Sequence, residues 1–339
     1  MLHEIFEGSH YEIGASFGLS LTRQNRFLLE EIPFPVTEER RQFAKACLPA
    51  YRAHFPEILE EIAGLAAGQQ CREEEIQALL FGMYALPPAC GCSCFAVSRD
   101  GQTLLGRNSD FDPASEPYNT NVIYRFSQGG SCDFTGNTTA FLEMEDGLNA
   151  HGLAVGLTFV VPTGAEPGLN AGMLLRLFLE KCRTTAEALA MLKRLPIASS
   201  QTFTLADAKG EIALAECSPQ GVEAVRPTAE HPFVCATNRF CSGKMAGFQR
   251  PGAETWHSDT RQRTMEQALS SCRGRLTSRE AQELLAGKHG FLCQYDPACG
   301  TDTVWSVVYD LSRATLYRAE GNPSRYPFFQ DSRFAFAGE

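Results

Sequence analysis

The spacing of apolar residues divides the chain into helical and strand-like regions. Residues 1 to about 90 look helical, with apolar side chains at helical spacing over 38–48, 55–67 and 72–84. Pro49 is expected to close the first of these helices, and Pro87 and Pro88 to stop the last. Later helices are predicted over 172–192, 186–195 (capped by Thr184), 260–270 and 278–286.

Short apolar or alternating runs between turn residues predict strands in the rest of the chain. These runs are 95–97, 103–106, 122–126, 154–161, 202–205, 211–216, 221–226, 233–237, 303–310 and 315–320. Residues 207–210, Asp-Ala-Lys-Gly, read as a hairpin turn. Strands that alternate with paired helices favour helices layered on sheets.

Composition and net charge exclude several classes of function but say less about the type of fold. A chain of 339 residues with 44% apolar content can bury a large core in one large or two modest domains. The net charge of -10 argues against nucleic acid and anionic membranes as partners. No apolar run approaches the ~20 residues of a membrane span, and the first residues lack the features of a secretory signal. We therefore expect a cytoplasmic protein.

The cysteines are numerous, but an odd total of thirteen does not suggest a disulfide framework. Most are expected to be free, buried thiols. Three of them, Cys90, Cys92 and Cys94, alternate in the connection between a helix and a strand. A zinc site is one account, although no flanking histidine or second cysteine pair completes four ligands.

Nucleophilic catalysis is the other account. A cysteine that attacks an amide needs a base, and none of the seven histidines stands in a motif that ties it to Cys92. A cysteine at a chain terminus carries its own base, since the α-amine has a pKa of roughly 7.7 to 8.0. Gly91 leaves room for cleavage before Cys92, whereas neither Cys90 nor Cys94 follows a glycine.

Five segments support this second account together. They read Gly-Cys-Ser at 91–93, Gly-Arg-Asn-Ser-Asp-Phe at 106–111, a strand-turn-strand pattern at 146–159, Ala-Thr-Asn-Arg-Phe at 236–240 and an apolar strand at 303–310. In this order they resemble the N-terminal nucleophile (Ntn) hydrolases of the acyl-coenzyme A:6-aminopenicillanic acid acyltransferase and choloylglycine hydrolase group, the linear amide C–N hydrolases. The likeness extends over nearly the whole chain.

The resemblance implies a role for each matching residue. Cys92 would be the nucleophile and its freed amine the base, with Asp110 accepting hydrogen bonds from that amine. Arg107 would lie beside the thiolate and lower its pKa. Asn238 would donate to the oxyanion, a contribution worth roughly 10²–10³ in rate. Arg261 would match a family arginine, with Arg263 as its competitor.

One position departs from the bile-salt branch of the group. Where those enzymes often have asparagine, this chain has Thr158, so a second oxyanion donor is expected from the backbone near Thr158 and Phe159. The 91 residues before Cys92 favour the self-processing, acyltransferase-like branch. Ordinary structural roles stay open for Arg107 and Asp110 as a surface ion pair and for Asn238 in a turn. Asp146, Gly147 and Asn149 are expected in a hairpin turn, and Trp305 is expected to pack in a core or line the pocket.

The fold that the resemblance implies is α+β, a four-layer αββα sandwich of two mostly antiparallel sheets. Residues 1–91 would form a helical propeptide and 92–339 the catalytic domain. The implied activity is self-processing followed by hydrolysis of a linear amide through an acyl-enzyme. Alternatives are an acyltransferase that passes the acyl group to an amine and a non-catalytic binding protein. No cofactor is expected, the partner would be a small-molecule amide or acyl substrate, and a homo-oligomer is compatible with the sequence.

Overall fold

Fourteen strands and nine α-helices are assigned in the computed structural model, which describes the chain except residues 33, 87–90, 129, 254 and 337–339. The helices are α1 His10–Arg23, α2 Leu28–Glu31, α3 Glu38–His54, α4 Pro56–Gln69, α5 Glu73–Phe81, α6 Ala171–Lys181, α7 Thr185–Leu192, α8 Ser258–Ser271 and α9 Ser278–Leu285. The strands are β1 Leu2–Gly8, β2 Gly91–Arg99, β3 Gln102–Phe111, β4 Thr120–Phe126, β5 Phe134–Thr138, β6 Asp146–Asn149, β7 Ala154–Phe159, β8 Gln201–Ala206, β9 Ile212–Ser218, β10 Gly221–Val225, β11 Phe233–Ala236, β12 Asp302–Asp310, β13 Thr315–Ala319 and β14 Phe329–Asp331.

The strands form two sheets that pack face to face. The larger sheet has the order β1-β4-β5-β6-β7-β8-β9-β10, and the smaller has the order β11-β2-β3-β12-β13-β14. Among the paired strands of the described residues, β1 and β4 are parallel and the others antiparallel. Antiparallel order suits the short connections between neighbouring strands.

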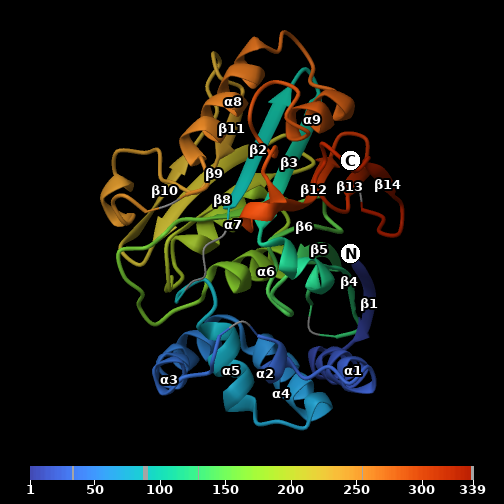
Figure 1. The fold of residues 1–339 in the computed structure, drawn as a ribbon, viewed down its shortest axis with the longest axis vertical. Helices are drawn as coiled ribbons and strands as arrows, with labels where there is room; N and C mark the ends of the chain where they lie inside the picture. Colours follow the sequence, from blue (N-terminus) through green and yellow to red (C-terminus); the bar gives the residue numbers. More distant parts are fainter. Residues whose placement is uncertain (33, 87–90, 129, 254, 337–339) are drawn as a thin grey trace.

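Helices cover both outer faces. Helices α6 and α7 pack on the larger sheet, β2 and β3 of the smaller sheet pack on β7 and β8, and α8 and α9 cover the far side (Figure 1). The prediction of a four-layer αββα sandwich is therefore confirmed. The sheets approach closely where Gly156 faces Cys94, since a β-carbon on Gly156 would lie 2.5 Å from the Cys94 sulfur.

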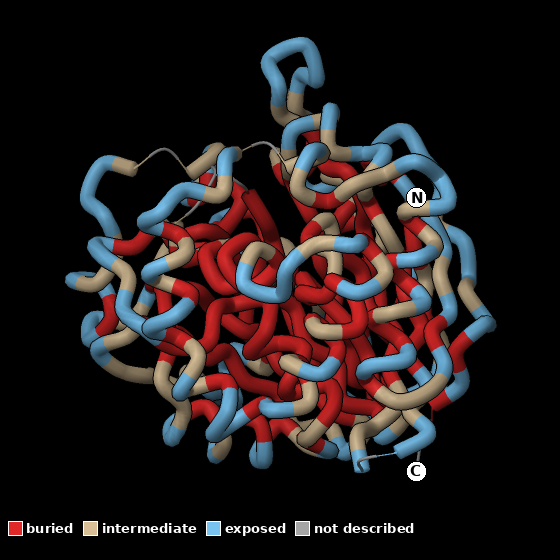
Figure 2. The backbone as a smooth tube through the Cα atoms, turned by 90° about the horizontal axis from the view of Figure 1, so that it is seen from below, coloured by how far each residue is buried: buried red, intermediate tan, exposed pale blue. Residues whose placement is uncertain are grey.

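Buried backbone runs through the centre of the molecule and exposed backbone around its rim (Figure 2). The central strands are buried on both faces, because helices lie on one side of each sheet and the other sheet on the opposite side. Polar side chains on these strands are consequently removed from water, and they need partners within the protein.

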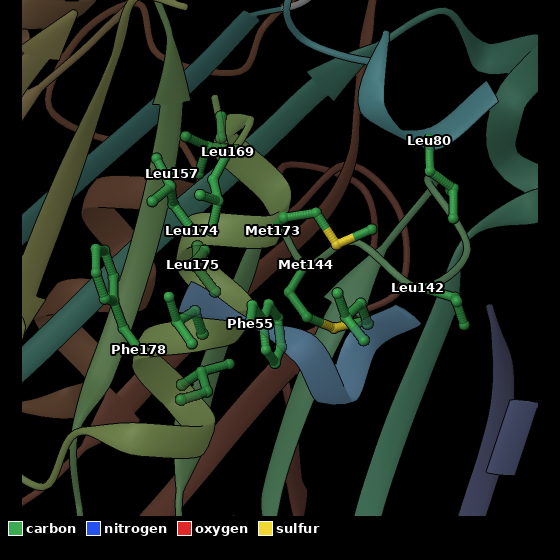
Figure 3. Packing of buried hydrophobic residues seen from close by; sticks show 14 of the residues in the cluster. Phe55, Leu80, Leu142, Met144, Leu157, Leu169, Met173, Leu174, Leu175 and Phe178 are labelled. Atoms are coloured by element: carbon green, nitrogen blue, oxygen red, sulfur yellow. The ribbon is translucent and has the colours of Figure 1, made fainter. Parts of the chain in front are cut away.

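The segment before Cys92 packs on the outer side of α6, and helices α1–α5 gather at one end of the molecule (Figure 1). Phe55 and Leu80 of this segment belong to the same apolar cluster as Met144 and Met173 (Figure 3). One part is not helical, contrary to the sequence prediction: Leu2–Gly8 forms β1 at the edge of the larger sheet. Pairing with β4 supplies the backbone partners that this strand could not find alone.

Helix α3 also differs from the prediction, because it continues through Pro49 to His54. Residues on both sides of the proline are buried, and Tyr51 stacks on Phe81 with ring centroids 3.8 Å apart. Tertiary packing of the last turn thus outweighs the hydrogen bond that proline removes. The stop predicted at Pro87 and Pro88 lies outside the described residues.

Candidate active site

The antiparallel pair β2–β3 places Cys92 at the beginning of β2, the second strand of the smaller sheet. Cys92 is opposite Ser109, Gly91 is opposite Asp110, and Cys94 is opposite Arg107. Alternation along a strand sends Cys92 and Arg107 to the face between the sheets. The Cys92 side chain is almost completely buried, with 4% of its surface exposed.

Arg107 is the direct partner of the Cys92 thiol. Its Nη2 lies 3.0 Å from the sulfur, and its Nη1 donates to Asp146 Oδ2 at 2.9 Å. Its Nε donates to the carbonyl of Leu157 in the other sheet at 2.9 Å. The guanidinium is fully buried and held at all three nitrogens, so its charge is fixed beside the sulfur rather than free to turn away.

Asn238 and Arg261 hold the backbone of Cys92. The amide N–H of Cys92 donates to Asn238 Oδ1 at 2.9 Å, while Arg261 Nη1 donates to the carbonyl of Cys92 at 2.5 Å. Arg261 Nη2 also donates to Asn238 Oδ1 at 2.8 Å. Arg263, the competitor from sequence, is exposed and bonds to the carbonyl of Asp259 in its own helix. Of the two candidates, Arg261 is therefore the arginine that contacts the backbone of Cys92.

The amide orientation of Asn238 bears on its predicted role. Its Nδ2 donates to the carbonyl of Phe159 at 2.8 Å, and its oxygen accepts two donors, so the partners fix which end faces Cys92. In the uncut chain this end is the oxygen. Donation to an oxyanion stays a prediction for Asn238. The hydroxyl of Thr158 is engaged with Thr202 and with the carbonyl of Thr237, both at 2.7 Å.

Asp110 lies on the opposite face of the strand pair, beneath Gly91. Thr303 Oγ1 donates to its Oδ1 at 2.6 Å and the Tyr295 hydroxyl to its Oδ2 at 3.0 Å, with Arg261 Nη1 3.6 Å away. Burial raises the pKa of Asp110 despite the nearby Arg261. Acceptance of a hydrogen bond from a freed Cys92 amine stays a prediction.

Burial has the largest effect on the pKa values of the Cys92 and Cys94 thiols, and it raises both. It raises the pKa of Cys92 to about 11, although Arg107 acts in the opposite direction. It raises the pKa of Cys94 to about 12. The third alternating cysteine, Cys90, lies outside the described residues. At neutral pH both described thiols are therefore protonated in the uncut chain.

Two carboxylates of the site were missed at the level of sequence. Glu145 Oε2 lies 3.3 Å from Arg107 Nη2 and accepts from Ser109 at 3.1 Å. Asp146 accepts from Arg107, Trp305 Nε1 and the Tyr309 hydroxyl. Both residues are buried, but burial is a property of the fold, and the local sequence pattern shows neither this burial nor the partners that the carboxylates face.

The expected hairpin turn at Asp146 and Gly147 is wrong, because both residues belong to strand β6. The turn follows at 150–153, and Asn149 supports it by accepting from the backbone N–H groups of His151 and Leu153. Strand β6 is short, but β5 and β7 pair with it on both sides. Trp305 packs in the core, as expected, with its indole N–H bonded to Asp146.

A mainly apolar cavity of about 480 Å³ lies close to Glu145. It is lined by Glu31, Ile32, Phe34, Met83, Tyr84, Phe111, Asp112, Ala114, Ser115, Tyr118, Thr139, Ala140 and Phe141. Thr139 of its wall donates twice to Glu145 Oε1, at 3.0 Å from its N–H and 2.7 Å from its hydroxyl. Since part of the lining precedes Cys92, both sides of the predicted cleavage point build this cavity.

The comparison with protein families gives a match over most of the chain. The model for acyl-coenzyme A:6-aminopenicillanic acid acyl-transferase matches residues 97–325. The chain belongs to this family. The match includes Arg107, Asp110, Asn238 and Arg261 and begins after Cys92, so the placement of Cys92 among these residues comes from the structure.

Solved structures show more distant similarity. An N-acylethanolamine-hydrolyzing acid amidase ortholog from Caenorhabditis elegans has 18% identity and a TM-score of 0.48, over 65% of this chain and 93% of that one. Penicillin V acylase from Agrobacterium tumefaciens has 16% identity and a TM-score of 0.46, over 70% and 85%. A variant of conjugated bile acid hydrolase from Clostridium perfringens has 11% identity and a TM-score of 0.42, over 72% and 98%. Among curated proteins, no sequence matches.

Three further findings concern metal binding, disulfides and membrane-spanning helices. Within the described residues, no three side chains of His, Cys, Asp or Glu are grouped so that they could hold a metal ion. The described cysteines are free thiols. No helix in the described part of the chain is long and apolar enough to cross a membrane.

Proposed function

We propose that this chain is a cysteine amidohydrolase that cuts itself between Gly91 and Cys92 and then hydrolyses a linear amide through an acyl-enzyme on Cys92. The observation that carries the proposal is the set of contacts around one residue. Arg107 donates a hydrogen bond to the Cys92 sulfur. The N–H of Cys92 donates to Asn238, and the carbonyl of Cys92 accepts from Arg261. Membership of an acyl-transferring family supports an enzyme with this chemistry.

Self-cleavage would proceed in two balanced steps. The Cys92 sulfur attacks the carbonyl carbon of Gly91, a C–S bond forms, and the C–N bond to Cys92 breaks as the thiol proton passes to the leaving amine. Water then hydrolyses the thioester, which leaves a carboxylate on Gly91 and a free thiol on Cys92. The new α-amine would start 2.9 Å from Asn238 Oδ1, the present distance of the amide nitrogen.

The same thiol would then act on substrate. Cys92 attacks the substrate amide carbon, the amine product leaves with a proton, and water releases the acid. The α-amine of Cys92 is suited to move these protons because its ordinary pKa lies near 8 (roughly 7.7 to 8.0). Arg107 would stabilise the thiolate throughout.

Intact masses of the purified wild-type, Cys92→Ala and Cys94→Ala proteins test this proposal. We expect wild type to give two fragments, the larger beginning at Cys92, because the thiol cuts the preceding bond. The Cys92→Ala protein should stay whole. The matched control Cys94→Ala should be cut like wild type, since the thiol that Arg107 hydrogen-bonds in the described part of the chain is that of Cys92. A wild-type chain that stays whole would exclude the self-processing mechanism and favour the binding protein.

Acyl transfer is the second candidate, and the family description favours it. Hydrolase and acyltransferase share each step up to the acyl-enzyme, so the acceptor decides between them. Product analysis with an added primary amine distinguishes the two. A new amide in place of the acid identifies the acyltransferase.

The apolar cavity is the proposed site for the acyl group of the substrate. Thr139 in the cavity wall donates to Glu145, and Glu145 in turn accepts from Arg107. Phe111, also in the wall, directly follows Asp110 in β3. Its volume of about 480 Å³ is in the ordinary range of small-molecule sites, roughly 300–1,000 Å³. An apolar acyl chain fits such a lining better than a charged one.

Replacement Ala140→Trp should fill this cavity. We expect kcat/KM for an octanoyl para-nitroanilide to fall about tenfold relative to the acetyl compound, because only the longer chain needs the occupied space. Cleavage before Cys92 should be unchanged. Ala229→Trp, at an exposed position, serves as the matched control. An equal effect on both compounds would place the acyl group elsewhere.

A further inference from the structure

Trp256 lies directly against the residue before the predicted cleavage point. A β-carbon built on Gly91 would come within 2.7 Å of Trp256 Cε3 and 3.2 Å of Asp110 Cβ. Real β-carbons do not approach other atoms as closely as the first distance. The space that a side chain at position 91 would need is therefore already occupied by the indole ring and the Asp110 side chain.

The backbone that presents this ring is held in an unusual conformation. Trp256 and His257 are consecutive residues with φ values of 49° and 58°, in the left-handed region that side chains disfavour. The carbonyl of Trp256 accepts from Arg261 Nε at 2.8 Å and lies 3.3 Å from the Tyr295 hydroxyl. Such a conformation persists only where the surroundings enforce it.

The groups that hold Trp256 are the same groups that hold the site. Arg261 binds the Trp256 carbonyl through Nε and the Cys92 carbonyl through Nη1. The Tyr295 hydroxyl contacts both the Trp256 carbonyl and Asp110, and its ring meets the indole edge-on at 6.4 Å. The position of the indole is thereby tied to the backbone of Cys92.

We propose that Trp256 is a positioning residue for the cleavage before Cys92: its indole fixes Gly91 so that the Gly91 carbonyl is presented to the Cys92 sulfur. The ring takes no part in the bond changes. This inference rests on the proposed self-processing and adds a residue to it. It also explains in steric terms why glycine occupies position 91.

Time courses of cleavage test the inference in the full-length chain, with urea unfolding as the check on stability. Trp256→Ala should slow cleavage at least about tenfold, since a Gly91 that is free to move seldom reaches attack geometry. Trp256→Phe should restore part of the rate. Phe329→Ala, an exposed aromatic at the edge of the smaller sheet, should cut like wild type.

Cleavage rates of variants at Gly91 and Trp256 together distinguish direct contact between these residues from a general structural role of the tryptophan. Gly91→Ala should be cut slowly because of the clash, and the double variant Gly91→Ala/Trp256→Ala should be cut faster than Gly91→Ala alone. A double variant no faster than Gly91→Ala would overturn the inference. So would wild-type cleavage rates in a folded Trp256→Ala protein. An uncut wild-type chain would instead remove the proposed function itself.

Discussion

Replacing Arg107 with methionine is expected to reduce the rate of cleavage before Cys92 by about ten- to a thousandfold. The guanidinium 3.0 Å from the sulfur favours the thiolate, and loss of an adjacent opposite charge typically changes a pKa by about 1–3 units. Because the pKa of Cys92 is already raised to about 11 by burial, the thiolate population at neutral pH would fall further. Cleavage rates from time-resolved intact masses measure the effect.

The dependence on pH has a definite sign. The thiolate is the attacking form, so the wild-type rate should rise about tenfold per pH unit between roughly pH 6 and 9, well below the pKa of about 11. In Arg107→Met the whole curve should move to higher pH. A flat profile in wild type would contradict attack by the thiolate of Cys92.

Stability must be measured beside activity in this variant. Arg107 forms buried ion pairs with Asp146 and Glu145, and loss of one partner from a buried ion pair typically costs about 3–5 kcal/mol. Arg107→Lys keeps the charge but not the three-nitrogen geometry, and it provides a second, less disruptive variant. A folded Arg107→Met protein with the wild-type cleavage rate would exclude the assigned role.

Replacing Arg176 with methionine is expected to lower the free energy of unfolding by about 3–5 kcal/mol. Arg176 on α6 is fully buried and contacts two buried carboxylates, with Nη2 2.5 Å from Glu61 and Nε 2.8 Å from Glu180. Its Nη1 also lies 3.2 Å from the Tyr124 hydroxyl. Without the cation, the two buried carboxylates would keep His10 and the hydroxyls of Tyr124 and Ser131 as partners, but they would lose the fixed positive charge.

The network joins the two sides of the predicted cleavage point. Glu61 and His10 precede Cys92, whereas Arg176 and Glu180 follow it. We therefore expect the cleaved wild-type protein to elute as one particle, and the cleaved Arg176→Met protein to lose the N-terminal fragment more readily in urea. Arg183→Met, exposed just beyond the same helix, is the matched control and should change stability by less than about 0.5 kcal/mol.

Urea midpoints and size-exclusion profiles of both variants provide the measurements. An Arg176→Met protein within about 1 kcal/mol of wild type would mean that the buried carboxylates become neutral or rearrange at little cost. The network would then contribute little to the attachment of the N-terminal segment.

Local sequence determined the periodic elements and the choice of candidate residues. Helices α8 and α9 and strands β12 and β13 follow from apolar spacing, which is a property of neighbouring residues. The structure also brings Arg107, Asn238 and Arg261 into contact with Cys92, although up to 169 positions separate them in sequence. The order of the motifs in the sequence could indicate that these residues belong to one site, but not which of their atoms are in contact.

Tertiary structure decided the features that depend on distant partners. Leu2–Gly8 is a strand because β4 pairs with it, and α3 runs through Pro49 because Tyr51 packs on Phe81. Asp146 looked like a turn residue, yet it is a buried acceptor for Arg107 and Trp305. The same reason applies to each case. A backbone or side-chain group that leaves water must find a partner, and the sequence near it does not reveal which distant residue the fold supplies.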